Sequence, residues 1–139
     1  MIKRSDVIRI KMPFPHVKSN LAVNSHMYIC HCVNGHVTKF VKCQTLKPYM
    51  LASTPMQHYW DETPDSNRNP FQRLTRIDCD KEFVTQHVKF DDNLKTTIRP
   101  DVCPDVMSHI DYELQCDGYS SHHISDTDLV SLNPLITKI

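Results

Sequence analysis

The sequence predicts a mainly β α+β fold, in which a small, curled antiparallel sheet is capped by a helix. Three observations predict it: an alternating apolar run at residues 7–12, two β-rich runs joined by Asn34-Gly35, and an apolar stripe at helical spacing after residue 100. Strands and helices do not alternate as a parallel sheet requires, and no repeat is present. Only two glycines occur, which argues against the glycine-rich loops that usually cradle nucleotides.

Size and composition indicate a single domain spanning residues 1–139. A chain of this length buries about two thirds of its unfolded surface and needs no disulfide or metal to hold its core. Hydrophobic residues make up 40% of the sequence, yet no apolar run approaches the roughly 18 residues of a membrane span. The N-terminus begins with a strand pattern rather than the apolar core of an export signal. We therefore expect a soluble cytoplasmic protein with no membrane partner, whose six cysteines are reduced thiols.

Charge is distributed unevenly along this chain, whose formal net charge is zero. Residues 1–48 contain eight lysines and arginines against the single acid Asp6, whereas the remainder contains eight basic and fifteen acidic residues. Because phosphate binding depends on local rather than total charge, one interpretation is a positive surface on a neutral protein. The other is that the two halves neutralise each other across the fold.

The first predicted element is a strand over Val7–Met12, in which apolar residues alternate with Arg9 and Lys11. The apolar side chains would face a core, and the basic pair would face solvent or a ligand. Prolines end the strand, and Phe14–Ser25 has the polar, irregular character of a loop. A loop of about a dozen residues suggests a functional flap, and Lys18 lies on it.

A β-hairpin is the clearest local prediction. The runs Met27–Val33 and His36–Cys43 are joined by Asn34-Gly35, the dipeptide that best tolerates the positive φ angles of a two-residue type I′ turn. If these two residues form the whole loop, His26 lies opposite Cys43.

That register would bring three chemically active side chains together. Thr45 and Lys47 would share a face with Cys43, and His26 would be a diagonal neighbour of Thr45. Histidine can move the proton of a ribose 2′-hydroxyl, while a hydroxyl and a cation can stabilise charge on a phosphate. This is a set of groups suited to RNA cleavage without a metal. Alternatively, Thr45 is an ordinary strand-end hydroxyl and His26 a surface residue.

Other reactive side chains near the hairpin favour structural interpretations. Cys43 could be a nucleophile with His26 as its base, although a thiol inside a strand is more commonly packed. Two groups have metal-ligand chemistry: Cys30, Cys32, His36 and Cys43 on the hairpin, and Asp78, Asp80 and Glu82 beyond it. The first group lacks a Cys-x-x-Cys pair and the second resembles solvated acids at a turn. We expect neither a metal nor a cofactor.

Two further strands are predicted in the second half of the chain. They are Phe71–Ile77 and Lys81–Phe90, separated by a polar turn, with a break near Gln86. The composition of Asp61–Pro70 indicates an exposed loop. The segment Tyr49–Trp60 has no clear period and no assignment.

Two helices complete the prediction. The longer helix is predicted to have Pro104 in its first turn, a position that proline suits. It is predicted to end at Gly118, because glycine commonly stops helices. Its apolar stripe consists of Val102, Val106, Ile110 and Leu114. A short helix starts at Ser125 or Asp126, and the leucines after it would pack back on the sheet.

Short motifs across nearly the whole chain resemble the MazF/PemK (Kid) endoribonucleases, the toxins of toxin–antitoxin modules. The order of Lys3–Ile8, a proline-containing loop, a β-rich run, and a strand ending in Gln44–Lys47 is similar to that family, which opens with Arg-Gly-Asp-Ile-Val and has a catalytic Thr or Ser at the end of its third strand. The segment Ile77–Phe83 and the helix within Arg99–Leu114 fall where the family has its last core strands and C-terminal helix. Ser5 stands where the family has glycine.

The resemblance implies an SH3-like small barrel of the MazF/PemK type, a homodimer, and an acidic antitoxin as protein partner. It also implies metal-independent cleavage of single-stranded RNA, not DNA, with Thr45 stabilising the transition state. The family's catalytic Arg-Pro pair is replaced here by His26-Met27, so His26 would act as general acid and base. Lys18 and Lys47 would bind the RNA. The alternative function is a catalytically inactive RNA- or protein-binding module on the same fold.

Overall fold

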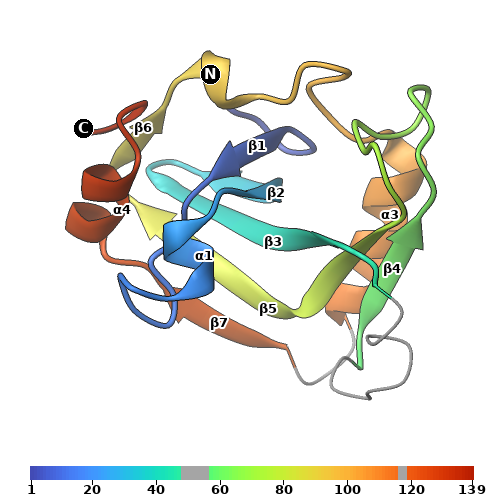
Figure 1. Cartoon of the computed structure of the whole chain (residues 1–139), viewed down its shortest axis with the longest axis horizontal. Helices are drawn as coiled ribbons and strands as arrows, with labels where there is room; N and C mark the ends of the chain where they lie inside the picture. The colour runs from blue at the N-terminus through green and yellow to red at the C-terminus, as the bar shows by residue number, and fades with distance from the viewer. Residues whose placement is uncertain (48–56, 116–118) are drawn as a thin grey trace.

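The computed structural model describes residues 1–47, 57–115 and 119–139. Figure 1 shows the arrangement of its helices and strands. In chain order they are β1 (Val7–Ile10), α1 (Asn20–Val23), β2 (His26–Asn34), β3 (Val37–Thr45), β4 (Tyr59–Glu62), β5 (Thr75–Gln86), β6 (Val88–Phe90), the 3₁₀ turn η1 (Asp92–Leu94), α3 (Pro104–Gln115), β7 (Ser120–His123), α4 (Asp126–Leu132) and β8 (Ile136–Lys138).

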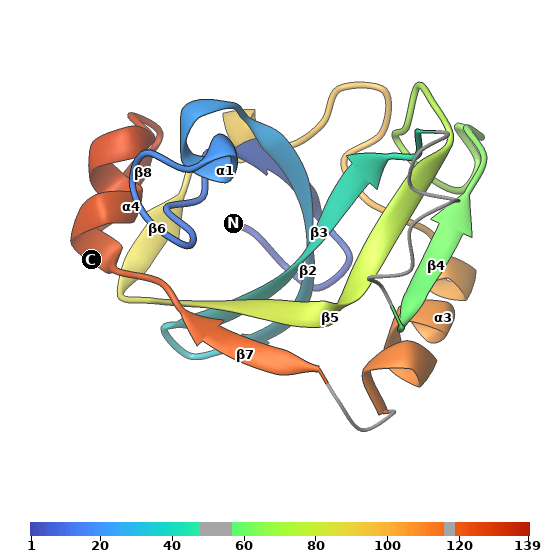
Figure 2. The ribbon, with the colours of Figure 1, turned by 60° about the horizontal axis from the view of Figure 1, so that its bottom comes forward.

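Six strands form one curved sheet, so the predicted α+β class with mostly sheet is confirmed. The strand order is β1-β2-β3-β5-β4, and β7 pairs with the C-terminal half of β5. Every pair is antiparallel except β5–β7, which is parallel. Strands β6 and β8 make a separate two-stranded sheet. Figure 2 shows how strongly the large sheet curls, with α3 and α4 at opposite ends of the molecule.

Each face of the large sheet carries its own apolar core, because side chains alternate between faces along a strand. Helix α3 covers one face, where Val106, Met107 and Ile110 pack with apolar residues of β1, β2, β3 and β5. On the other face, Tyr28, Phe40 and Phe83 pack against residues of β6, α4 and β8. The domain therefore has the sheet in the middle and a helical cover on either side.

The hairpin forms, but its register differs from the predicted one. Asn34 pairs with Val37, so the loop residues are Gly35 and His36 rather than Asn34 and Gly35. Gly35 has a φ of 61° at the first loop position, as in a type II′ turn, whereas the prediction assumed a type I′ turn. A β-bulge between Cys30 and Cys32 then shifts the pairing once more.

The shifted register changes which side chains share a face. Met27, not His26, lies opposite Cys43, and His26 pairs with Ile10 of β1. Alternation then places His26 on the face opposite to Cys43 and Thr45. The prediction that His26 and Thr45 are diagonal neighbours on one face of the hairpin is therefore wrong.

The polar turn predicted between two strands at residues 78–80 is also wrong, because β5 runs through it. The carboxylate of Asp78 accepts the backbone N–H of Asp80 at 2.8 Å, and that of Asp80 accepts those of Gln57 and His58 at 2.8 and 3.0 Å. The two carboxylates thus have hydrogen-bond partners close to the point where the register of the β3–β5 pairing shifts. The predicted break near Gln86 is confirmed, since His87 has a φ of 58° and β6 follows it.

Both predicted helices form. Pro104 is the first residue of α3, and Ser125 caps α4 by accepting the N–H of Asp128 at 3.2 Å. Against α3, the Trp60 ring of β4 stacks on His109 with the ring centres 3.4 Å apart. The predicted stop at Gly118 and most of the unassigned Tyr49–Trp60 segment lie outside the described residues.

Two general expectations can be compared with the described part of the chain. No helix within it is both long enough and apolar enough to cross a membrane. The cysteines described there are free thiols, namely Cys30, Cys32, Cys43, Cys79 and Cys103.

Candidate functional site

Two adjoining hollows lie where β1, β2 and β3 meet the surrounding loops. The first, here called the His26 hollow, has a volume of about 300 Å³ and contains three of the four predicted site residues. Its lining is Arg9, Asn20, Ser25, His26, Met27, Cys43, Gln44, Thr45 and Lys47. The sequence therefore identified residues that border one space, although it did so through an incorrect register.

The second hollow, here called the Arg73 hollow, has a volume of about 450 Å³. It shares Arg9, Met27 and Thr45 with the first, so these three residues stand where the hollows meet. Its other lining residues come from the segment before β5 and from the η1 region: Pro70, Gln72, Arg73, Thr75, Asn93, Leu94, Lys95, Thr96, Thr97 and Ile98. Basic residues line both hollows, and among the described residues no aspartate or glutamate does.

His26 is held in the tautomer that a general base requires. Its Nδ1 lies 3.0 Å from the carbonyl oxygen of Asn24. Because a carbonyl oxygen can only accept, Nδ1 carries the hydrogen and Nε2 is left with a free lone pair. The half-buried imidazole is therefore oriented by the backbone just ahead of β2.

Burial and two positive neighbours lower the pKa of His26 below its usual value of 6.5. Desolvation is the largest cause, and the charges of Lys42 and Arg9 act in the same direction, against the hydrogen bond to Asn24. At neutral pH the imidazole is thus mostly uncharged. It can accept a proton but cannot supply the lasting positive charge of an arginine.

Thr45 ends β3 with an exposed side chain at the junction of the hollows. It pairs with Thr75 of β5, whose hydroxyl is occupied in donating to the carbonyl oxygen of Arg73 at 2.8 Å. Two residues further on, Lys47 also lines the His26 hollow. Thr45 and Lys47 therefore both line the space that His26 borders, with Thr45 on the opposite face of the sheet from His26.

Cys43 has the opposite character, although it too reaches this lining. Only 2% of its surface is exposed, and burial raises the pKa of its thiol above the usual range. A thiol that resists deprotonation is a poor nucleophile. Its place in the apolar core under α3 supports the interpretation of a packed residue.

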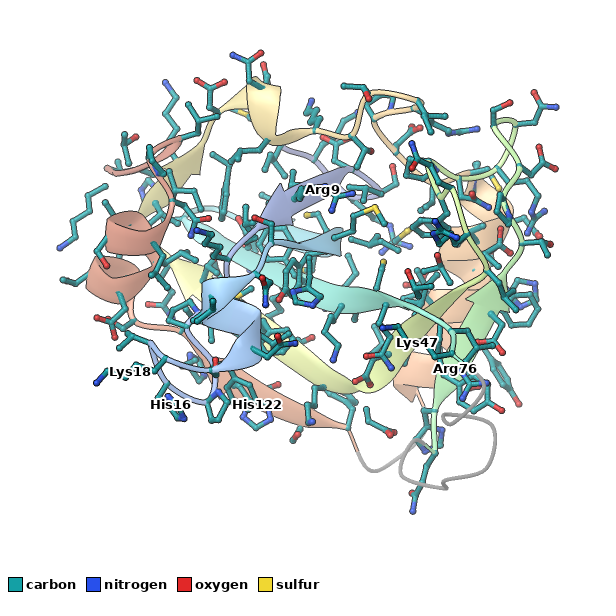
Figure 3. The ribbon with its side chains drawn as sticks, viewed as in Figure 1. Arg9, His16, Lys18, Lys47, Arg76 and His122 are labelled. Carbon is teal, nitrogen blue, oxygen red and sulfur yellow. The ribbon has the colours of Figure 1, made fainter. Side chains whose placement is uncertain are left out.

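Lys18 lies away from both hollows. In Figure 3 it is grouped with His16 and His122 at the end of the molecule opposite to Lys47 and Arg76. Its backbone N–H donates to Nδ1 of His16 at 3.2 Å, so the flap turns back on itself there. An RNA contact by Lys18 stays a prediction, and Asn20, two residues further along the same segment, lines the His26 hollow.

Arg76, near Lys47 in Figure 3, has a structural role instead. Its guanidinium donates twice to the carboxylate of Asp61, at 2.8 and 2.9 Å, and lies 3.8 Å above the ring of Tyr59. Its charge is balanced by this pairing. We therefore leave Arg76 out of the candidate site.

The most important residues that sequence reasoning left out of the site are Arg9, Arg73 and Lys95. Arg9 had a signal, since its alternation with apolar neighbours predicts a side chain facing solvent or a ligand. Arg73 and Lys95 had none, because each lies in a different loop and only the folded sheet brings them near Thr45. The cationic lining thus draws on both halves of the chain.

No set of three His, Cys, Asp or Glu side chains within the described residues is arranged to hold a metal ion. The acids considered for such a site have other partners: Glu82, for example, lies 2.8 Å from His31 and accepts the hydroxyl of Ser121 at 2.7 Å. Comparison with protein-family models, curated proteins and solved structures returns no match to this chain.

Proposed function

We propose that the protein is an endoribonuclease that cleaves single-stranded RNA without a metal ion, on an SH3-like domain of the MazF/PemK type. The observation that supports this most is the His26 hollow: a neutral imidazole with a free Nε2 borders the same space as a hydroxyl and two cations, with no carboxylate in the lining. A phosphodiester is an anion, so an acid-free lining favours it.

In the proposed reaction, Nε2 of His26 removes the proton from a ribose 2′-hydroxyl. The resulting oxygen attacks the adjacent phosphorus and forms a 2′,3′-cyclic phosphate, while the 5′-oxygen leaves and takes a proton from water. Arg9, Thr45 and Lys47 stabilise the negative charge that develops on the phosphate oxygens. Arg9 supplies the permanent positive charge that a neutral His26 lacks.

The family resemblance adds a homodimer and an acidic antitoxin to this proposal. The two hollows offer an acidic segment a complementary surface, because their lining carries positive charge and no carboxylate. An adjacent reading frame that encodes a small acidic protein would support this partner.

The test is incubation of the purified protein with single-stranded RNA in EDTA at pH 5 to 8. We expect cleavage to a cyclic or 3′-phosphate and a 5′-hydroxyl, and no cleavage of DNA of the same sequence, which lacks the nucleophile. His26→Ala should lower the rate about 10²–10⁴-fold, as loss of a general base does. Thr45→Val should lower it about 10²-fold or more, as loss of an oxyanion donor does.

Matched variants control for folding. Thr45→Ser keeps the hydroxyl and should retain most activity, and His123→Ala removes an exposed histidine outside both hollows. Circular dichroism should show the same thermal transition for all four variants. Absence of cleavage by the wild-type protein across the pH range would refute the enzyme. Retained RNA binding in that case would identify a catalytically inactive binding module.

A further inference from the structure

The Arg73 hollow has no part in the proposed chemistry, yet it continues the space in which that chemistry would occur. Arg9, Met27 and Thr45 belong to both linings. A polymer whose scissile phosphate lies beside Thr45 must extend in both directions from it. The Arg73 hollow is therefore placed to receive the next part of the chain.

Two guanidinium groups in this hollow are available to a ligand. Within the described residues, no ion pair or side-chain hydrogen bond engages Arg9 or Arg73, and both side chains are exposed. The third cation, Lys95, is already paired, with its ammonium 3.2 Å from Asp6 and 3.4 Å from Asp92. Arginines suit phosphate well, because their planar N–H groups donate in pairs to its oxygens.

Apolar and neutral polar groups complete the lining. Leu94 and Ile98 line the hollow together with the shared Met27, and Ile98 is 48% exposed despite being apolar. Asn93 and Gln72 offer amides that can both donate and accept. An apolar surface with amides beside it matches a nucleobase, which has an apolar face and a hydrogen-bonding edge. The volume of about 450 Å³ lies within the range of small-ligand pockets, about 300–1,000 Å³.

We propose that the Arg73 hollow is a second nucleotide subsite for the same RNA strand. Arg73 holds the phosphate that links this nucleotide to the scissile one, Arg9 stands between this phosphate and the scissile one, and the base lies against Ile98 and Leu94. The identity of the ligand as RNA rests on the proposed function. The subsite predicts that the protein acts on longer RNA much better than on a dinucleotide.

The test measures binding separately from cleavage, with full-length protein and a fluorescent single-stranded RNA of eight nucleotides. Complete 2′-O-methylation of this probe blocks the nucleophile, so that fluorescence anisotropy reports binding alone. Arg73→Ala should weaken binding about tenfold, the effect of losing a charge-assisted hydrogen bond to phosphate. Arg73→Glu should weaken it further. Lys89→Ala, which removes an exposed cation from β6 outside both hollows, should have little effect.

Cleavage assays complete the design, with an unmodified octamer and a dinucleotide. Arg73→Ala should lower the kcat/KM for the octamer but leave that for the dinucleotide unchanged. The subsite is refuted if Arg73→Ala and Lys89→Ala bind the probe equally well, or if the wild-type protein does not bind it. If wild type cleaves the octamer and Arg73→Ala does so equally well, the subsite fails and the enzyme stands. If the protein binds the probe in an Arg73-dependent way but cleaves no RNA, the subsite stands and the enzyme fails.

Discussion

His26 shows how neighbours decide the role of a single residue. Its imidazole is oriented by the Asn24 carbonyl, and burial, Lys42 and Arg9 all disfavour its protonated form. A histidine in such surroundings serves as a base and not as a cation. Arg9 therefore has two roles in the proposed mechanism, because it lowers the pKa of the base and stabilises the phosphate.

The first prediction concerns the pH dependence of cleavage. A base acts only when it is unprotonated, so kcat/KM should rise with pH through the pKa of His26 and reach half its plateau below pH 6.5. Arg9→Ala removes a positive charge that disfavours protonation, so its midpoint should move to higher pH. Arg9→Lys keeps the charge, and its midpoint should stay near that of wild type. A midpoint for Arg9→Ala at or below the wild-type value would contradict the assignment.

At the residue scale the sequence predicted the site in part. His26, Thr45 and Lys47 border one hollow because they lie near the beginning of β2 and the end of β3, although the observed register places His26 and Thr45 on opposite faces of the sheet. Lys18 lines neither hollow, and Figure 3 shows it at the end of the molecule opposite to Lys47. Arg73 could not be predicted, because its proximity to Thr45 depends on how β3 and β5 pair over a long sequence separation.

At the scale of elements, the hairpin and β5 show why local patterns fall short. Moving the two-residue loop from Asn34-Gly35 to Gly35-His36 shifts each cross-strand partner by two residues, and the β-bulge between Cys30 and Cys32 reverses one of them, which leaves the one-residue shift that changes the face. Asn34-Gly35 is compatible with either position of the loop. In β5, the alternating acids resemble a turn in sequence. Asp78 instead accepts the backbone N–H of Asp80 within a continuous strand, and Asp80 accepts those of Gln57 and His58, just before β4. The helices were easier to predict, because their caps and apolar stripes are local.

The second prediction concerns helix α3. Ile110 is fully buried between this helix and the sheet. Ile110→Ala should lower the free energy of unfolding by about 2–5 kcal/mol, because it removes buried methyl groups and leaves a cavity. Urea denaturation followed by circular dichroism measures the change. Gln115→Ala, at an exposed position of the same helix, should change it by less than about 0.5 kcal/mol. Equal effects of the two substitutions would show that α3 is not packed as described.

For the whole molecule, zero net charge conceals a local concentration of positive charge. The uneven distribution of charge along the sequence had two interpretations, a positive surface and mutual neutralisation of the two halves, and neither was complete. Acids of the second half do pair with cations of the first, as Asp111 does with Arg4. The described residues that line the hollows nevertheless include no carboxylate, and Arg73 and Lys95 among them come from the second half. The fold class could be predicted from periodicity alone, whereas the shape of this surface required the full topology.

The third prediction concerns salt. Binding of single-stranded RNA releases counterions, which gives log Kd a dependence on log salt of about 0.7 per phosphate neutralised. Arg9, Lys47 and Arg73 together should give a slope of about 2, and Arg73→Ala should lower it by about 0.7. Anisotropy titrations of the 2′-O-methylated probe between 50 and 300 mM KCl measure this slope. A value near zero would mean that these cations do not contact phosphate.

The stack of Trp60 on His109 makes the protein its own optical probe. The chain has a single tryptophan, and this one contacts α3 while lying outside both hollows. Its emission should therefore follow the separation of α3 from β4 during unfolding. The same spectrum can thus report the integrity of the helix while RNA binding is measured independently with the labelled probe.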